Sequence, residues 1–265
     1  MKVMLILTKP LTLTYAFLCF FFWSTDNNVL KQGKPLNGYK KATILKPMDV
    51  ATLKKIGKHH NQATINDVVL GLVSVSMKEY MKALGDQSKS INLLIPYSLR
   101  QIPKTAEEHR LCNDFSCLCF SLAICDSFEE SVGRVKKQTR AMKKSVYPYG
   151  VTALTEFIAA MPGIVGQLVM MWCVSKASLL MSNVPGPKGG MVYGGSKCIG
   201  FIALAPGLGD LAFGITALSM GDNLYMAIQA DTSIIDNPKQ IRAIIERNYD
   251  ELSTLVKDNW IYFLE

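Results

Sequence analysis

Histidine, the side chain best suited to acid–base chemistry at neutral pH, occurs three times among the 265 residues. His59 and His60 are adjacent in the stretch KHHNQATINDVVLG, and His109 stands apart from them. The adjacent pair has two interpretations: a catalytic base, or exposed residues in a connection between two helices. The sequence offers no histidine with a setting that suggests a Ser-His-Asp triad, and no pair of carboxylates in a shared apolar site.

The residues after the histidine pair predict the start of a helix. Thr64 and Asp67 have the spacing of a capping box, in which each side chain accepts a hydrogen bond from the other residue's backbone N–H. Asp67 also falls in the first turn, where the helix dipole favours a negative charge. Apolar residues then recur every three or four positions as far as Leu84, and Gly85 supplies the stop.

A second stretch with chemical potential is SNVPGP, from Ser182 to Pro187. Its two prolines fix the backbone around Gly186 and remove two amide donors. Such a rigid loop could hold Ser182 and Asn183 beside a ligand, but a stiff turn that ends a strand without a ligand is the simpler alternative. The glycines that follow, at positions 189, 190, 194 and 195, fit no phosphate-binding motif and predict turns.

The seven cysteines do not predict a metal site. Cys112, Cys117, Cys119 and Cys125 cluster, but they lack the paired C-x-x-C spacing of zinc sites. CLCFSLAIC instead predicts a strand whose small side chains include thiols. Reduced cysteines favour the cytosol or a membrane surface that faces it.

The composition is that of a globular protein, with 49% apolar and 19% charged residues and a formal net charge of +8. A positive charge of this size suits anionic lipid headgroups or an anionic CoA ester. No dense basic tract with interleaved aromatic residues is present, so the sequence predicts no binding of nucleic acid.

The N-terminal residues 1–25 are strongly apolar and predict a helix, although Lys9 and Pro10 interrupt the apolar run. The uncharged remainder is short for a transmembrane helix, which needs about 20 residues. A membrane anchor and a helix cut from its packing partner both remain open. Residues 26–41 are polar and turn-rich and predict a linker.

The remaining residues mix helices and strands without regular alternation, which predicts an α+β layered sandwich. Strands are expected at the start of residues 41–60, over 91–100 and 114–124, in the stretch 177–187 that ends in a rigid loop, and near 197–204, 211–219 and 223–231. A hairpin turn at GDN would join the last two. Helices are expected near 49–58, 64–84, 127–145 and 238–256, and over 151–174 with a break at Pro162 and Gly163.

Three motifs in order resemble the C-terminal half of the wax ester synthase/diacylglycerol acyltransferase family. They are TINDVVLG at a helix start, IPYSLR on a strand and SNVPGP before a glycine-rich loop. The resemblance extends from about Tyr39 to Leu255. It implies one half of a two-half fold of the chloramphenicol acetyltransferase type, with a channel between the halves. Acyl-CoA would be the co-substrate, with no permanently bound cofactor, and the acyl group would pass to a diacylglycerol or a long-chain alcohol.

The resemblance also implies which residues serve the reaction. The family's general base is a histidine in an HHxxxDG motif of the N-terminal half; Thr64 and Ile65 stand where that motif needs Asp and Gly, so His59 and His60 are expected to be exposed connection residues. Asn66 and Asp67 match the family's ND motif and would support the active site, unless they only organise the helix start. Ser182, Asn183, Pro185, Gly186 and Pro187 would line the substrate channel. Arg100 would reach CoA or, more simply, form a structural salt bridge.

The sequence therefore predicts an O-acyltransferase C-terminal domain over residues 42–258, for triacylglycerol or wax ester synthesis, without a catalytic residue or a metal of its own. We expect the histidine-bearing half to be missing, through a misassigned start or a truncated gene. The alternative is a non-catalytic partner or binding protein with the same fold. A cytosol-facing surface of the endoplasmic reticulum, the plasma membrane or a lipid droplet is the expected location.

Overall fold

The computed structural model describes residues 2–31, 35–97, 105, 107–108, 115–187, 189, 191–205, 207 and 209–258. In chain order the elements are α1 (Lys2–Phe22), β1 (Lys40–Ile44), β2 (Met48–Asp49), α2 (Val50–His59), α3 (Ile65–Ala83), β3 (Ser90–Tyr97), β4 (Ser116–Ala123), α4 (Phe128–Lys144), α5 (Tyr147–Ala159), α6 (Gly163–Val174), β5 (Leu179–Pro185), β6 (Met191–Tyr193), β7 (Ser196–Cys198), β8 (Phe213–Met220), β9 (Asn223–Asp231) and α7 (Pro238–Asp258).

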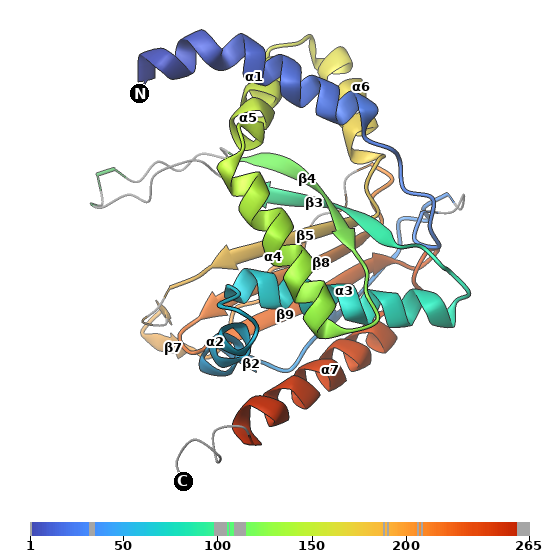
Figure 1. Ribbon diagram of the computed structural model, residues 1–265, viewed down its shortest axis with the longest axis vertical. Coiled ribbons are helices and arrows are strands. Elements are labelled where there is room, and N and C mark those ends of the chain that lie inside the picture. Colours follow the sequence, from blue (N-terminus) through green and yellow to red (C-terminus); the bar gives the residue numbers. More distant parts are fainter. Residues whose placement is uncertain are drawn as a thin grey trace.

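The centre of the fold is a mixed sheet of 7 strands in the order β1-β9-β8-β5-β3-β4, with β2 also paired to β9. β5 is parallel to both of its neighbours, β3 and β8, while the other pairs are antiparallel. One face of the sheet is covered by α2, α3, α4 and α7, whereas α1, α5 and α6 gather at the β4 end (Figure 1). The layered α/β sandwich predicted from the sequence is confirmed.

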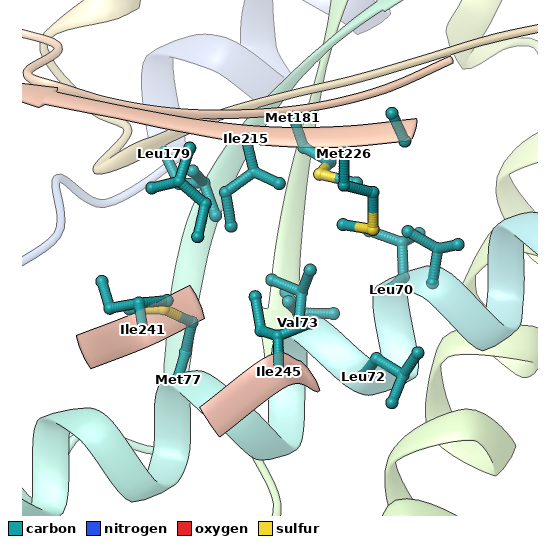
Figure 2. Close-up of a cluster of buried hydrophobic side chains, with 14 of the residues drawn as sticks. Leu70, Leu72, Val73, Met77, Leu179, Met181, Ile215, Met226, Ile241 and Ile245 are labelled. Atoms are coloured by element: carbon teal, nitrogen blue, oxygen red, sulfur yellow. The ribbon is translucent and has the colours of Figure 1, made fainter. Parts of the chain in front are cut away.

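The main core lies between the sheet and its helical layer (Figure 2). α3 contributes apolar side chains toward the sheet, where they meet Met181 from β5 and Met226 from β9, and α7 adds Ile241 and Ile245. Side chains of a strand alternate between the two faces of the sheet. Leu179 and Met181 therefore lie in this core, while Leu180 packs in a separate cluster on the opposite face.

Most of the predicted elements form, but the strand expected over 197–204 is wrong. The structure has a short hairpin there, β6 paired with β7, which turns at Gly194 and Gly195 with positive φ angles of 54° and 81°. Residues 199–205 then run outside any strand. They are held partly through side chains, as where the Thr216 hydroxyl donates to the Ala203 carbonyl at 2.5 Å.

The helix predicted within residues 1–25 forms as α1, which continues through Pro10. The helix packs along α5 (Figure 1). Its end is fixed by Lys176, whose ammonium donates to the Phe20 carbonyl at 2.6 Å and to the Trp23 carbonyl at 2.7 Å. A cation at these C-terminal carbonyls also complements the helix dipole. Among the described residues, the structure contains no helix with the length and apolar character needed to cross a bilayer.

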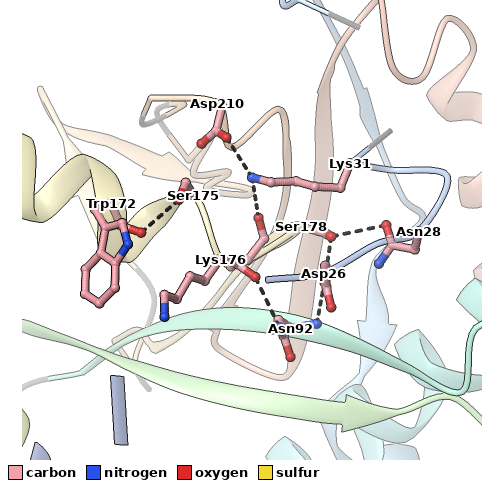
Figure 3. A network of polar contacts seen from close by, with 10 residues as sticks. Asp26, Asn28, Lys31, Asn92, Trp172, Ser175, Lys176, Ser178 and Asp210 are labelled. Atoms are coloured by element: carbon pink, nitrogen blue, oxygen red, sulfur yellow. Dashed lines mark hydrogen bonds and ion pairs between the residues drawn. The ribbon is translucent and has the colours of Figure 1, made fainter. Parts of the chain in front are cut away.

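The start of the 26–41 segment is integrated into the fold (Figure 3). The Asp26 carboxylate accepts hydrogen bonds from the Asn92 backbone at 2.7 Å and from the Ser178 hydroxyl at 2.6 Å. Lys31 donates to the Ala177 carbonyl at 3.0 Å and forms an ion pair with Asp210 at 3.1 Å. These bonds join the segment after α1 to the N-terminal ends of β3 and β5.

Candidate functional site

The first turn of α3 is organised by the predicted capping box, which is confirmed. One oxygen of Asp67 accepts from the Thr64 backbone at 2.9 Å and from its hydroxyl at 2.7 Å. The other oxygen accepts from the Thr139 hydroxyl of α4 at 2.8 Å. Asp67 is buried, so its charge is stabilised by these bonds rather than by water. The residue therefore fixes both the start of α3 and its contact with α4.

Asn66, one position earlier, faces a different partner. The Asn183 side-chain amide donates to the Asn66 side-chain oxygen at 3.1 Å, which joins the start of α3 to β5. Both side chains are only half-buried. The Asn66 amide nitrogen has no acceptor among the described residues and is left with hydrogen-bonding capacity for a ligand. The structure thus brings together two residues from two of the motifs that carry the family resemblance.

Ser182 does not join this pair. Because neighbouring strand residues point to opposite faces, Ser182 lies on the Leu180 face of β5, away from Asn66. The structure therefore does not present Ser182 and Asn183 side by side to one ligand.

The end of β5 is nevertheless tightly constrained. Pro185 pairs in register with Ser219 of β8, and the Gly186 amide donates to the Ser219 hydroxyl at 3.2 Å. A Cβ atom at Gly186 would lie 2.0 Å from the Ser219 carbonyl oxygen, so glycine is required by the close approach of two strands. The Pro187 carbonyl then accepts from the Gly221 amide at 3.1 Å.

The two described histidines lie where α2 ends: His59 is its last residue and His60 is its C-cap, at the start of the connection to α3. The prediction that both are exposed holds for His59 but not for His60. His59 is exposed, whereas His60 is half-buried with its ring edge against Phe128, the ring centres 5.0 Å apart. Burial, with a smaller contribution from His59, holds the pKa of His60 below its usual 6.5. Neither imidazole has a hydrogen-bond partner among the described residues, so neither has the oriented geometry of a general base. Arg100, His109 and Cys112 lie outside the described residues.

An apolar cavity of about 280 Å³ lies where α1, α5 and α6 meet β3 and β4. Its lining includes Phe20, Leu94, Cys117, Leu154, Ile158 and Cys173. Burial raises the pKa of the Cys117 and Cys173 thiols to about 11, so both are protonated and unreactive at neutral pH. This cavity could not be predicted from the sequence, because its lining comes from five elements.

The helices around this cavity also expose apolar side chains to the surface. We call the set on α1 and α6 the apolar end face, which comprises Leu11, Phe17, Leu18, Phe21, Phe22, Ile164, Val165, Leu168, Met171 and Trp172. The rings of Phe21 and Trp172, 6.3 Å apart, connect the two helices. Exposed apolar side chains gathered on two contacting helices are typical of contact with a membrane or another protein.

The described residues contain no group of three metal-ligating side chains.

Comparisons with known proteins identify the family and the fold of the chain. A family model described as the WS/DGAT C-terminal domain matches residues 111–253, more than half of the chain. The chain therefore belongs to the wax ester synthase/diacylglycerol acyltransferase family, through its C-terminal domain.

The fold is shared with solved structures of low sequence identity. The wax ester synthase/diacylglycerol acyltransferase from Marinobacter aquaeolei VT8 superposes with a TM-score of 0.64 at 16% identity, over 94% of this chain and 58% of that one. The starter condensation domain of rhizomide synthetase, in complex with C8-CoA and Leu-SNAC, gives a TM-score of 0.56 at 12% identity, over 94% and 52%.

A third match is the cyclization-docking bidomain from Sorangium cellulosum, with a TM-score of 0.57 at 11% identity, over 94% of this chain and 49% of that one. The fold is thus that of acyltransferases and condensation domains. The chain spans 58% of the length of the Marinobacter enzyme.

Proposed function

We propose that this chain forms the C-terminal half of an acyl-CoA-dependent O-acyltransferase that makes triacylglycerol or wax ester. The observation that carries the proposal is the hydrogen bond between Asn66 and Asn183. It joins the ND and SNVPGP motifs into one polar site, half-exposed on a fold shared with a wax ester synthase. Membership of the family supports the reaction class.

In the proposed reaction, a base removes the proton of the acceptor hydroxyl while its oxygen attacks the thioester carbonyl. A new C–O bond forms, the C–S bond breaks and the CoA thiolate takes up a proton. The HHxxxDG motif does not occur in the sequence, and neither described histidine is oriented for this role. We therefore assign the base to the histidine of that motif in an N-terminal half. Asn66 would donate its free amide hydrogens to the oxyanion that develops on the carbonyl.

The acyl chain needs an apolar site that excludes water, and the cavity beside α5 and α6 supplies one. Its volume of about 280 Å³ is close to the lower limit of about 300 Å³ for ligand pockets, which suits part of a fatty acyl chain. The lining is apolar, and its thiols are neutral at physiological pH. These properties favour a hydrocarbon over a polar ligand.

Diacylglycerols and long-chain alcohols dissolve in membranes and lipid droplets rather than in water. The apolar end face would let the protein lie on such a surface, with its apolar side chains inserted among the lipids. We therefore propose peripheral attachment to a cytosol-facing membrane or lipid-droplet surface, with α1 and α6 in contact with the lipid.

Acyl transfer from palmitoyl-CoA to diolein or hexadecanol tests the proposal. The chain would be assayed alone and fused behind an HHxxxDG-containing N-terminal half of the family. We expect transfer only by the fusion, and only while the HHxxxDG histidine is intact. Efficient transfer by the 265-residue chain alone would contradict the assignment of the base to another half.

The second candidate function is a non-catalytic partner protein that keeps the fold. It is favoured by the absence of a hydrogen-bonded histidine among the described residues. A fusion that folds and binds palmitoyl-CoA but transfers no acyl group to either acceptor would support this candidate instead.

A further inference from the structure

A second cavity, of about 460 Å³, lies along α4 on the side of the α2–α3 connection. We call it the α4 groove. Its charged lining consists of Lys136, Lys137, Arg140 and Lys144 from α4, with Glu129 at one end, and His60 lines it from the α2–α3 connection. The lining of the α4 groove differs from that of the apolar cavity, because it contains four cationic side chains and a single carboxylate.

We propose that the α4 groove binds the phosphate-bearing nucleotide end of acyl-CoA, an inference that rests on the proposed acyltransferase function.

The spacing of the cations supports a built anion site. Residues 136, 140 and 144 are separated by four positions, so they form one row along the helix, with Lys137 beside it. The remaining lining from α4 is small, and a Cβ atom at Gly133 would meet nothing within 4 Å. Several phosphates could therefore approach the helix backbone while the long basic side chains close around them.

The protein neutralises little of the positive charge in the groove, since Glu129 is the one carboxylate among its lining residues. Within the described residues, Lys137, Arg140 and Lys144 have no ion-pair partner. By contrast, Arg134 on another side of α4 pairs with Glu130 at 2.7 Å. Lys136 is held at the edge of the groove because its ammonium donates to the Asn61 carbonyl. Neighbouring cations repel one another, so the row at positions 136, 140 and 144 is stabilised when an anionic ligand binds beside it.

The loop opposite α4 also has an unusual backbone. Asn61 and Gln62 have φ angles of 56° and 61°, in the left-handed region that non-glycine residues adopt rarely. Two consecutive residues in this conformation turn the chain sharply and keep Asn61 and His60 on the wall of the groove. Backbone strain of this kind is often found where a loop forms part of a binding site.

The helix that carries the groove cations is also hydrogen-bonded to the start of α3. Thr139, between the groove residues Lys137 and Arg140, donates its hydroxyl to Asp67. Asn66 adjoins Asp67 and holds the Asn183 amide. α4 therefore presents the groove cations on its exposed side and is tied through the buried Thr139 to the helix start that carries Asn66. The volume of about 460 Å³ is within the range of about 300–1,000 Å³ that suits small ligands.

The test is binding of adenosine 3′,5′-bisphosphate, CoA and dephospho-CoA to the purified chain by calorimetry. K137E/R140E removes two groove cations, and K54E/K239E changes the net charge equally through exposed lysines outside the groove. We expect wild-type affinity for the bisphosphate to fall about tenfold or more in the groove variant and by less than about twofold in the control. CoA should bind more tightly than dephospho-CoA.

Three results would overturn the proposal: no binding of any nucleotide to wild type, an equal loss in both variants, or a groove variant that keeps nucleotide affinity while losing binding to phosphatidic acid vesicles. The last result would identify a phospholipid headgroup as the ligand. Circular dichroism checks folding, and Arg140→Gln is the milder variant if the double variant unfolds. Since the bisphosphate has no thioester, this binding does not depend on acyl transfer, so the two proposals fail separately.

Discussion

The hydroxyl of Thr139 in α4 donates a 2.8 Å hydrogen bond to the carboxylate of Asp67, which caps α3. This bond joins the buried side of α4, opposite its exposed basic residues, to the turn that presents Asn66. The polar pair Asn66–Asn183 and the α4 groove therefore belong to one arrangement around the N-terminus of α3. The apolar cavity is formed by other elements, at the β4 end of the sheet. Such a division suits a substrate with a phosphorylated nucleotide at one end and a hydrocarbon at the other.

Replacement of Thr139 by valine should destabilise the fold. The variant removes the only α4 donor to Asp67 recorded among the described residues and leaves one buried carboxylate oxygen without its partner. We expect a loss of about 1.5–3 kcal/mol in the free energy of unfolding, as for hydrogen bonds to charged groups. Urea denaturation would measure it. Thr254→Val is the matched control: its exposed hydroxyl donates to the Asp250 carbonyl, and we expect a change within about 0.5 kcal/mol.

Asn66→Ala should lower catalysis more than stability. If the Asn66 amide stabilises the oxyanion, its removal from the active fusion should lower kcat by about 100-fold, as for other oxyanion donors. The loss in unfolding free energy should stay near 1 kcal/mol, because the only recorded partner is the half-buried Asn183. Ser182→Ala, on the opposite face of β5, is the control and should retain most of the activity. Parallel losses of folded protein and activity in Asn66→Ala would show that Asn66 only organises the helix.

Gly186→Ala should disturb the end of β5. The new Cβ atom would lie 2.0 Å from the Ser219 carbonyl oxygen, so β5 and β8 must separate locally. We expect a loss of about 1–3 kcal/mol, typical of overpacking. Gly189 is the matched control, since a Cβ atom there meets nothing within 4 Å. Equal melting temperatures for Gly186→Ala and the wild type would contradict the conclusion that the contact between β5 and β8 requires glycine at position 186.

The helix start at Thr64 could be predicted from sequence because a capping box is local, with all its donors and acceptors within four residues. The contact between Asn66 and Asn183 could not, because it joins residues 117 positions apart and depends on the position of β5 in the sheet. The family resemblance indicated both motifs but not that they touch. Ser182 and Asn183 are neighbours in β5, so their side chains lie on opposite faces of the sheet.

The mistaken strand over 197–204 has a related cause. An apolar run indicates burial or a strand, but a strand also needs a partner for its backbone hydrogen bonds. In the structure β8 is already paired with β5 and β9 on its two sides. The run after Cys198 therefore has no free edge of β8 to join. Neither cavity was predictable, since each combines residues from separate elements.

Attachment to membranes should depend on the apolar end face. Ile164 and Leu168 are exposed on one side of α6, so glutamates at both positions should be tolerated by the fold. Inserting two such side chains into lipid contributes roughly 3 kcal/mol, and I164E/L168E should weaken vesicle binding by about tenfold or more. Co-sedimentation with phosphatidylcholine–phosphatidylserine vesicles measures this. V192E/I199E, equally exposed but outside the apolar end face, is the control. Equal losses in the two variants would assign the binding to net charge.

His60 should report on both folding and ligand binding through its pKa. Burial holds this pKa below 6.5, so the folded state favours the neutral imidazole. The stability it contributes is therefore present above pH 6.5 and declines as the pH falls toward the lower pKa of the folded state. His60→Gln should remove this part of the pH dependence. Phosphates in the α4 groove would favour the protonated ring, so adenosine 3′,5′-bisphosphate should raise the pKa measured by NMR titration and bind more tightly as the pH falls from 7.5 to about 6. A pKa that does not change with the bisphosphate would place the phosphates away from His60.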